Sequence, residues 1–287
     1  MQSLKNKMHF FKNRTLLIAT NHHKDMVLAP IFEKYLFVKC VSSNQINTDI
    51  FGTFSGEVER TNSAEITLRE KSEYAYKETN IDLVLTSEGS FGPHPMIPFS
   101  TINEEWLLLK DYKNNIEIKE KQISINTNFS NKKIASTTDI IEFAKQIGFP
   151  KHAIIFRDST SNSKKIVKGI HRLYDLKKYY NEFKNEFGSF SAETDMRAMY
   201  NPTRMHEIYK LGLKLLNKMV SLCPKCEFPG FGITDLTFGL PCEDCLMPSK
   251  SILSHIFKCQ ACHFQLERMY PKGKKFEEPM YCEFCNP

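Results

Sequence analysis

Eight cysteines arranged as four Cys-x-x-Cys pairs are the feature that most constrains how this chain can fold. The chain has 287 residues and nine cysteines, and the four pairs all lie in its last quarter. The pairs are Cys223/Cys226, Cys242/Cys245, Cys259/Cys262 and Cys282/Cys285. Two residues between ligands form a tight knuckle that directs both sulfur atoms at one ion, and a tetrahedral zinc site needs two knuckles. The sequence therefore predicts two bound zinc ions.

The gaps between successive pairs suggest which knuckles share an ion. They contain 15, 13 and 19 residues. The first and third gaps fall within the 15–20 residues usual in zinc ribbons, so we expect one ion on the first four cysteines and one on the last four. Four protein ligands leave no position for water, which favours structural rather than catalytic zinc. A redox-active dithiol or an iron–sulfur cluster is the alternative.

Charge divides the chain into two unlike parts. Residues 221–287 contain seven basic and eight acidic residues, a balance of −1 that becomes −5 with eight thiolates and two Zn²⁺ ions. Residues 1–220 contain 32 basic and 25 acidic residues, a balance of +7. Because nucleic acid attracts positive charge, the cysteine-rich segment is not expected to be the main source of nucleic-acid affinity.

Two expected absences bear on where the protein works. No apolar run approaches the ~20 residues of a membrane helix. The first 14 residues are basic but lack the apolar stretch of a secretory signal, so we expect a cytoplasmic protein without a membrane partner. A reducing cytosol favours metal binding over disulfides.

Strand and helix patterns alternate in the first part of the chain, which predicts an α/β domain with a mixed sheet at 1–220, followed by a double zinc ribbon at 221–287. A capping box formed by Asn62 and Glu65 would open one helix. Asn201-Pro202 would open another, in which Gly212 marks a close packing contact. The expected strands are 15–19, 37–41, 82–86, 116–125 and 153–156, and the expected helices are 22–36, 62–79, 138–147 (stopped by Gly148), 173–187 and 201–220.

Polar residues follow two of these strands directly. Residues 20–24, Thr-Asn-His-His-Lys, join a strand to a helix, where loop amides, a helix N-terminus and Lys24 can hold phosphate. Ser87-Glu88-Gly89 follows the strand at 82–86, and a carboxylate there can hold Mg²⁺ against phosphate oxygens. The carboxyl ends of parallel strands meet at one edge, so we expect both segments to line one pocket. Each residue taken alone is more often an ordinary solvated one.

Residues 14–95 resemble the inosine-triphosphate pyrophosphatase and Maf superfamily. The shared pattern is an apolar strand, Thr-Asn-x-x-Lys, a helix bearing Glu and Lys, and a strand that ends in an acidic residue and Gly. Those enzymes cleave nucleoside triphosphates to a monophosphate and pyrophosphate with Mg²⁺. The resemblance implies phosphate contacts for Thr20, Asn21, Lys24 and Lys71, and metal or catalytic roles for Glu65 and Glu88.

A second resemblance covers nearly the whole chain. Residues 52–60, 86–95, 193–199 and 201–205 and the closing Cys285-Asn286-Pro287 are similar to an uncharacterised bacterial family, a domain of unknown function. That family implies no activity.

Four charged residues lie within a short stretch near the end of the α/β part. Arg197 and Arg204 could clamp a phosphate bidentately, and Glu193 or Asp195 could bind metal or act as a general base. The alternative is an ion-paired strap that ties the α/β domain to the zinc module.

Two functions follow from these observations. The first is a protein that binds a nucleotide or nucleotide conjugate and hydrolyses a phosphoanhydride with Mg²⁺, with Glu88, Glu65 and Lys24 as the catalytic residues. The second is a non-catalytic zinc-ribbon adaptor that binds RNA or protein on a retained nucleotide-fold scaffold. Fold alone cannot decide between them.

Overall fold

The chain folds into two compact units, seen in a computed structural model that describes residues 10–43, 46–52, 62–93, 97, 100–158 and 165–287. One unit, called here the α/β unit, comprises Asn13–Asn115 and Lys119–Leu215. The other, called here the cysteine unit, comprises Met1–Lys12, Ile116–Ile118 and Leu216–Pro287. The division falls within a helix, five residues before the boundary expected from composition.

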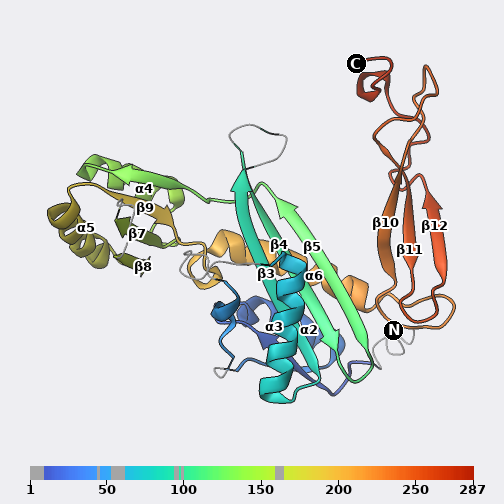
Figure 1. Ribbon diagram of the computed structural model, residues 1–287, viewed down its shortest axis with the longest axis horizontal. Coiled ribbons are helices and arrows are strands. Elements are labelled where there is room, and N and C mark those ends of the chain that lie inside the picture. The colour runs from blue at the N-terminus through green and yellow to red at the C-terminus, as the bar shows by residue number, and fades with distance from the viewer. Residues whose placement is uncertain (1–9, 44–45, 53–61, 94–96, 98–99, 159–164) are drawn as a thin grey trace. The chain divides into compact units, whose positions relative to one another are not determined.

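The α/β unit is built on a five-stranded mixed sheet in the order β2-β1-β3-β4-β5. Its strands β3, β4 and β5 are labelled in Figure 1. β1 is parallel to β2 and to β3, whereas β3 is antiparallel to β4. The apolar runs at 16–19 and 83–85, on two neighbouring strands, are buried because both faces of the sheet are covered there. The strands are β1 (Thr15–Ala19), β2 (Lys39–Val41), β3 (Leu83–Pro93), β4 (Thr101–Asp111) and β5 (Ile116–Ser124).

Three helices cover this sheet: α2 (Asp25–Leu36), α3 (Ala64–Thr79) and α6 (Pro202–Met219). Asn201 caps α6 as expected, since its side chain accepts the Arg204 N–H at 3.0 Å. A Cβ atom at Gly212 would lie 2.8 Å from Leu28 Cδ2, which confirms the close contact expected there, between α6 and α2. The cap expected at Asn62 was wrong, because Ser63 caps α3 by accepting the Ile66 N–H.

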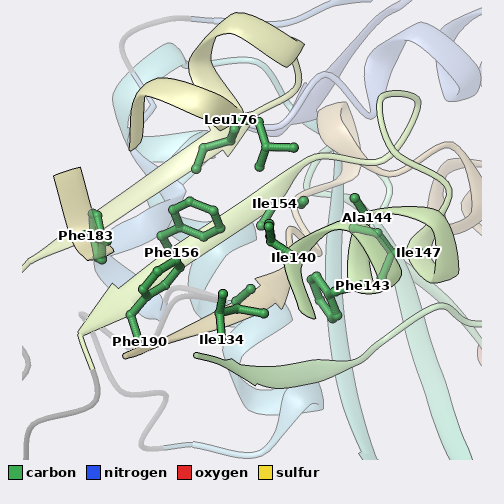
Figure 2. Close-up of a cluster of buried hydrophobic side chains, with 12 residues drawn as sticks. Ile134, Ile140, Phe143, Ala144, Ile147, Ile154, Phe156, Leu176, Phe183 and Phe190 are labelled. Carbon is green, nitrogen blue, oxygen red and sulfur yellow. The ribbon is translucent and has the colours of Figure 1, made fainter. Parts of the chain in front are cut away.

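A second sheet in the same unit has four antiparallel strands in the order β6-β9-β7-β8. They are β6 (Asn131–Ile134), β7 (Ile154–Asp158), β8 (Ile166–Ile170) and β9 (Phe190–Thr194). α4 (Thr137–Ile147) and α5 (Leu173–Phe187) pack on it around Phe143, Phe156, Phe183 and Phe190 (Figure 2). α4 ends at Gly148 with φ of 83°, as its sequence predicts.

The cysteine unit contains a three-stranded antiparallel sheet, β10-β11-β12 (Figure 1). Its strands are β10 (Gly232–Phe238), β11 (Ile252–Lys258) and β12 (Gln265–Met269). Its short 3₁₀ helix is η3 (Pro279–Tyr281), and the α/β unit contains two more, η1 (Thr48–Phe51) and η2 (Ala198–Tyr200). Among the residues described, no helix combines the length and apolar character that crossing a membrane requires.

Candidate functional site

The eight paired cysteines gather into two tetrads, and the geometry of both suits a metal ion. Their sulfur atoms lie 3.6–3.8 Å apart in the four pairs that face one another. Four sulfurs at 2.3 Å from a central ion in tetrahedral geometry are about 3.8 Å apart. An all-sulfur tetrahedral donor set suits zinc or iron. The tetrads are Cys223/Cys226/Cys259/Cys262 and Cys242/Cys245/Cys282/Cys285.

The expected sequential pairing of the knuckles was wrong, because the first knuckle shares a tetrad with the third and the second with the fourth. β10 carries the chain away from the first tetrad to the second, and the antiparallel β11 carries it back. Successive knuckles therefore fall at opposite ends of the sheet. The first gap, of 15 residues, was expected to be a ribbon loop, but this gap and the 13-residue gap after it each hold a seven-residue strand that spans about 24 Å.

The knuckles share one backbone geometry. In all four, the residue after the second cysteine donates its N–H to the carbonyl of the first, as Leu246 does to Cys242 at 3.1 Å. Glu227, Leu246 and His263 occupy this position with φ near 57°, which closes a tight turn around the ligands. The repeated turn presents both sulfurs of each pair to one point.

A second group of functional side chains lies in the α/β unit where β1 ends and β3 continues. The last β1–β3 partners are Ala19 and Thr86, and β3 runs on to Pro93 alongside β4. Ser87-Glu88-Gly89 is therefore part of a strand, and the strand end expected at residue 86 was wrong. Beyond the end of β1, Lys24 Nζ donates to Ser87 Oγ at 2.8 Å.

Successive side chains of β3 point to opposite faces of the sheet, so its polar residues make contacts on both faces. Thr86 and Glu88 face α3, where Thr86 Oγ1 donates to the Leu68 carbonyl and Glu88 forms a buried ion pair with Lys71. Ser87, one residue along, faces the side from which Lys24 approaches. Glu88 is thus held by a lysine within the fold, and this lysine occupies the carboxylate that was expected to hold Mg²⁺.

A second buried ion pair joins α6 to β4. Arg204 Nε donates to Glu105 Oε1 at 2.6 Å, Nη2 donates to Oε2 at 3.2 Å, and Nη1 donates to the Met196 carbonyl at 2.5 Å. Gly89 lies opposite Glu105 in the β3–β4 register. A Cβ atom at Gly89 would come within 2.5 Å of Arg204 Nη2, so this ion pair needs glycine at that position.

Arg197 is engaged by the acidic residue beside it in the chain. Its Nε and Nη2 donate to the two carboxylate oxygens of Asp195 at 3.0 and 2.7 Å. The carboxylate is fully buried and also accepts the Gly169 N–H at 3.0 Å. Glu193 lies apart from this pair and accepts from Arg157 of β7.

Electrostatics show that the cationic side chains act on one another. Burial, followed by the charge of Arg204, lowers the pKa of Lys24 to about 7. Burial, followed by the charges of Lys24, Arg204, Arg197 and Lys71, lowers the pKa of His22 to about 3, so this imidazole is neutral at pH 7. We call the group formed by Lys24, Lys71, Glu88, Glu105, Asp195, Arg197 and Arg204 the charge cluster.

Among the described residues, the charge cluster holds four cationic side chains and three carboxylates. Each carboxylate has its own cationic partner, and Lys24 bonds instead to the neutral hydroxyl of Ser87. At the more exposed rim, Asp49 Oδ1 lies 3.6 Å from His22 Nε2. The buried part of the cluster therefore has one positive charge in excess whenever Lys24 is protonated, which its pKa of about 7 restricts to neutral pH and below.

The residues implied by the pyrophosphatase resemblance fall into two groups. Lys24, Lys71 and Glu88 are brought together in the charge cluster. Thr20 and Asn21 shape its loop: Thr20 Oγ1 accepts the His22 N–H, and in its better-bonded orientation the Asn21 amide bonds to Ile46 and Thr48 backbone groups.

Glu65 is not brought to the cluster. It pairs on the surface of α3 with Arg69 at 2.8 Å and Lys119 at 2.5 Å. Conversely, Glu105 was not predicted from the sequence. Its only distinguishing feature there is that it directly precedes the apolar run Trp106-Leu-Leu-Leu. The conspicuous segment 53–60 and His94 lie outside the described residues.

An apolar pocket of about 470 Å³ lies between the N-terminal ends of α2 and α6. Three of its lining residues are adjacent in sequence to members of the charge cluster: His23 precedes Lys24, Ala198 follows Arg197 and Met205 follows Arg204. The rings of His206 and Tyr209 stack at the pocket with centroids 6.4 Å apart. The lining residues are His23, Met26, Val27, Ala198, Met199, Pro202, Met205, His206 and Tyr209.

Comparison with known proteins identifies a family but no activity. Searches against curated proteins and against solved structures gave no match. They therefore do not show the resemblance to inosine-triphosphate pyrophosphatases and Maf proteins. One family does match, from Lys71 to the end of the chain, so that it includes both cysteine tetrads and every member of the charge cluster except Lys24. By this match over residues 71–287, the chain belongs to the family described as Domain of unknown function (DUF6671).

Proposed function

We propose that the α/β unit binds a phosphorylated ligand of the nucleotide class, with phosphate at the charge cluster. The observation that carries the proposal is Lys24. Its amine is buried, its pKa is lowered to about 7, and its hydrogen-bond partner among the described residues is a neutral hydroxyl. A buried amine is costly unless an anion compensates it, and phosphate supplies that charge.

The apolar pocket supports a nucleotide over inorganic phosphate. Three of its lining residues are the sequence neighbours of Lys24, Arg197 and Arg204. A ligand whose phosphate meets the cluster would therefore extend its remaining groups toward the pocket. Its methionines and the stacked His206–Tyr209 pair offer a surface suited to a flat, apolar ring.

The enzymatic form of this proposal is Mg²⁺-dependent cleavage of a phosphoanhydride. Mg²⁺ in such sites is held by one or two carboxylates together with substrate phosphates. Glu105 and Glu88 are the carboxylates whose charges act on Lys24, Glu105 from the face of the sheet that Lys24 approaches and Glu88 from the face covered by α3. Both are ion-paired. Cleavage would therefore require Mg²⁺ to replace Lys71 as the partner of Glu88, which leaves Lys71 free to meet the phosphate.

The two tetrads support a separate role for metal in the cysteine unit. We propose that each holds one zinc ion with a purely structural function, because four thiolates complete its coordination. Zinc removal should then unfold the cysteine unit and leave the charge cluster intact, because every member of the cluster belongs to the α/β unit.

Calorimetric titration of the full-length, zinc-loaded protein tests the binding proposal. A panel of nucleoside mono-, di- and triphosphates would be titrated with and without Mg²⁺, together with pyrophosphate and phosphate. We expect at least one nucleotide to bind, and Lys24→Met to weaken that binding by at least ~10-fold, the scale of one charge-assisted contact. Glu65→Gln, which alters an exposed acid outside the cluster, is the matched control. Lack of binding by any nucleotide at millimolar concentration would refute the proposal.

The adaptor function has an observation of its own. Apolar side chains are exposed around the second tetrad, in a unit that does not contain the charge cluster. That surface is independent of nucleotide binding.

A further inference from the structure

Six apolar side chains are exposed around the second tetrad, with exposed fractions between 42% and 65%. All lie within four residues of a cysteine of that tetrad, so the knuckles hold them in one neighbourhood. We call this group the apolar tip; it consists of Phe238, Leu246, Met247, Met280, Tyr281 and Phe284. Single exposed apolar residues are ordinary, but a cluster of this kind marks an interaction site.

The first tetrad shows that exposure is not a consequence of the knuckle itself. There, Phe231 packs on Phe257 and Phe264 with ring centroids 5.8 and 6.1 Å away, in a core that includes Cys223 and Cys259. The knuckles of the two tetrads share the same backbone turn. One tetrad is therefore covered by the chain's own apolar groups, whereas the other presents its apolar groups to solvent.

The first tetrad is also tied to the rest of its unit through its knuckle. The Gln260 side chain, between two ligands, hydrogen-bonds to both the backbone N–H and the carbonyl of Glu117. At the equivalent position of the last knuckle, Glu283 pairs with the exposed Lys250, and beside it Phe284 is 60% exposed. The surface around the second tetrad thus resembles one half of an interface, whose other half would come from another molecule.

Charge indicates the kind of molecule. Residues 238–251 and 270–287 contain five acidic and four basic residues, and a tetrad of thiolates around a divalent ion adds −2, which gives a net charge of −3. Glu243 and Asp244 project between two ligands and are exposed, and neither forms an ion pair with any residue that the structure describes. A phosphate polymer or an anionic membrane would be repelled from this end of the unit.

We propose that the apolar tip is a docking site for a protein segment that is both apolar and basic. Apolar side chains of the segment would cover Leu246, Met280 and Phe284, while Lys or Arg residues would pair with Glu243 and Asp244. This arrangement fits an amphipathic segment, whose apolar stripe and charged flank lie side by side. Because the tip is built on the knuckles of the second tetrad, docking requires the metal at that tetrad.

Selection of peptides from a random display library against the full-length, zinc-loaded protein tests this. We expect the selected peptides to be enriched in Lys and Arg as well as in apolar residues, and their affinity to fall with rising salt. Phe284→Ser and Leu246→Ser should each weaken a selected peptide by at least ~10-fold, the loss of one buried anchor. Asp244→Lys should also weaken it. Ile233→Ser removes an apolar side chain of 42% exposure from β10 and should leave binding unchanged.

Metal content of two ions per chain, measured for each variant, shows that a lost interaction does not reflect a lost fold. The proposal is overturned if no peptide is selected, if the selected peptides bind the Phe284→Ser protein as well as the wild type, or if they are acidic. Binding of an RNA homopolymer that depends on Phe284 and Leu246 would also overturn it, in favour of a nucleic-acid surface. A nucleotide that binds the charge cluster has no bearing on these outcomes.

Discussion

The Arg204 guanidinium and the Glu105 carboxylate meet through two parallel hydrogen bonds directly above Gly89 of β3. Their side chains are 0% and 2% exposed, so this ion pair belongs to the interior of the α/β unit. It links α6, far along the chain, to the sheet in which β3 carries Ser87 and Glu88, the partners of Lys24 and Lys71.

Gly89→Ala should destabilise the protein, because the new methyl group would lie 2.5 Å from Arg204 Nη2 and 2.7 Å from Glu105 Oε2. Neither group can move away without losing buried hydrogen bonds, and overpacking of this kind costs about 1–3 kcal/mol. Urea denaturation followed by the fluorescence of Trp106, on β4, would measure it. Gly92→Ala is the control: it lies on the same strand with open space at its Cβ, and should change little.

Glu88→Gln should cost about 3 kcal/mol of unfolding free energy, because it leaves the Lys71 ammonium buried without its carboxylate. Glu65→Gln removes one acid from exposed pairs of α3, the helix that also carries Lys71, and should cost less than about 1 kcal/mol. Equal losses in the two variants would contradict the buried ion pair.

Lys24→Met should stabilise the protein at neutral pH while it weakens nucleotide binding. Burial lowers the pKa of Lys24 from 10.5 to about 7, so between these values the unfolded chain binds more protons than the folded one. Stability of the wild type should therefore rise with pH across that window, and be lowest, for this group, below about pH 7.

The gain in Lys24→Met should accordingly be largest at about pH 7 and below, on the order of 1–3 kcal/mol, and should shrink toward pH 10. Urea denaturation of both proteins at several pH values would show this. If the variant is less stable at every pH, Lys24 is a structural residue and the anion proposal loses its main support.

Double cysteine substitutions distinguish the two possible pairings of the knuckles. Cys226→Ser with Cys262→Ser removes two ligands of one tetrad and should leave about one zinc per chain. Cys226→Ser with Cys245→Ser removes one ligand from each tetrad and should reduce both ions. Sequential pairing predicts the reverse, so metal analysis of the two proteins decides between them.

The sequence predicted those elements whose cause is local. The Asn201 cap, the Gly148 stop and the four knuckles all depend on a few neighbouring residues, and each is found where expected. The two tetrads follow from the knuckles, but their pairing does not, because it depends on where β10 and β11 carry the chain.

The charge cluster shows a similar limit. Lys24 and Glu88 were found from their positions after apolar strands, but Ser87 and Gly89 looked like turn residues until pairing with β4 extended β3 to Pro93. Glu105 looked like any solvated acid, because its partner, Arg204, is 99 residues away in the sequence. Buried ion pairs of this separation leave no periodic signal in the chain.

The interleaved knuckles also set an order of events during synthesis. Neither half of the segment 221–287 contains a complete tetrad. The first tetrad can form only after Cys262 has been synthesised, and by then Cys242 and Cys245 of the second tetrad are already present but have no partner knuckle. The second tetrad closes only with Cys285. A chain cut short between Cys262 and Cys282 would hold one complete set of four ligands and one open pair of thiols, so the fourth knuckle decides whether the second tetrad can form at all.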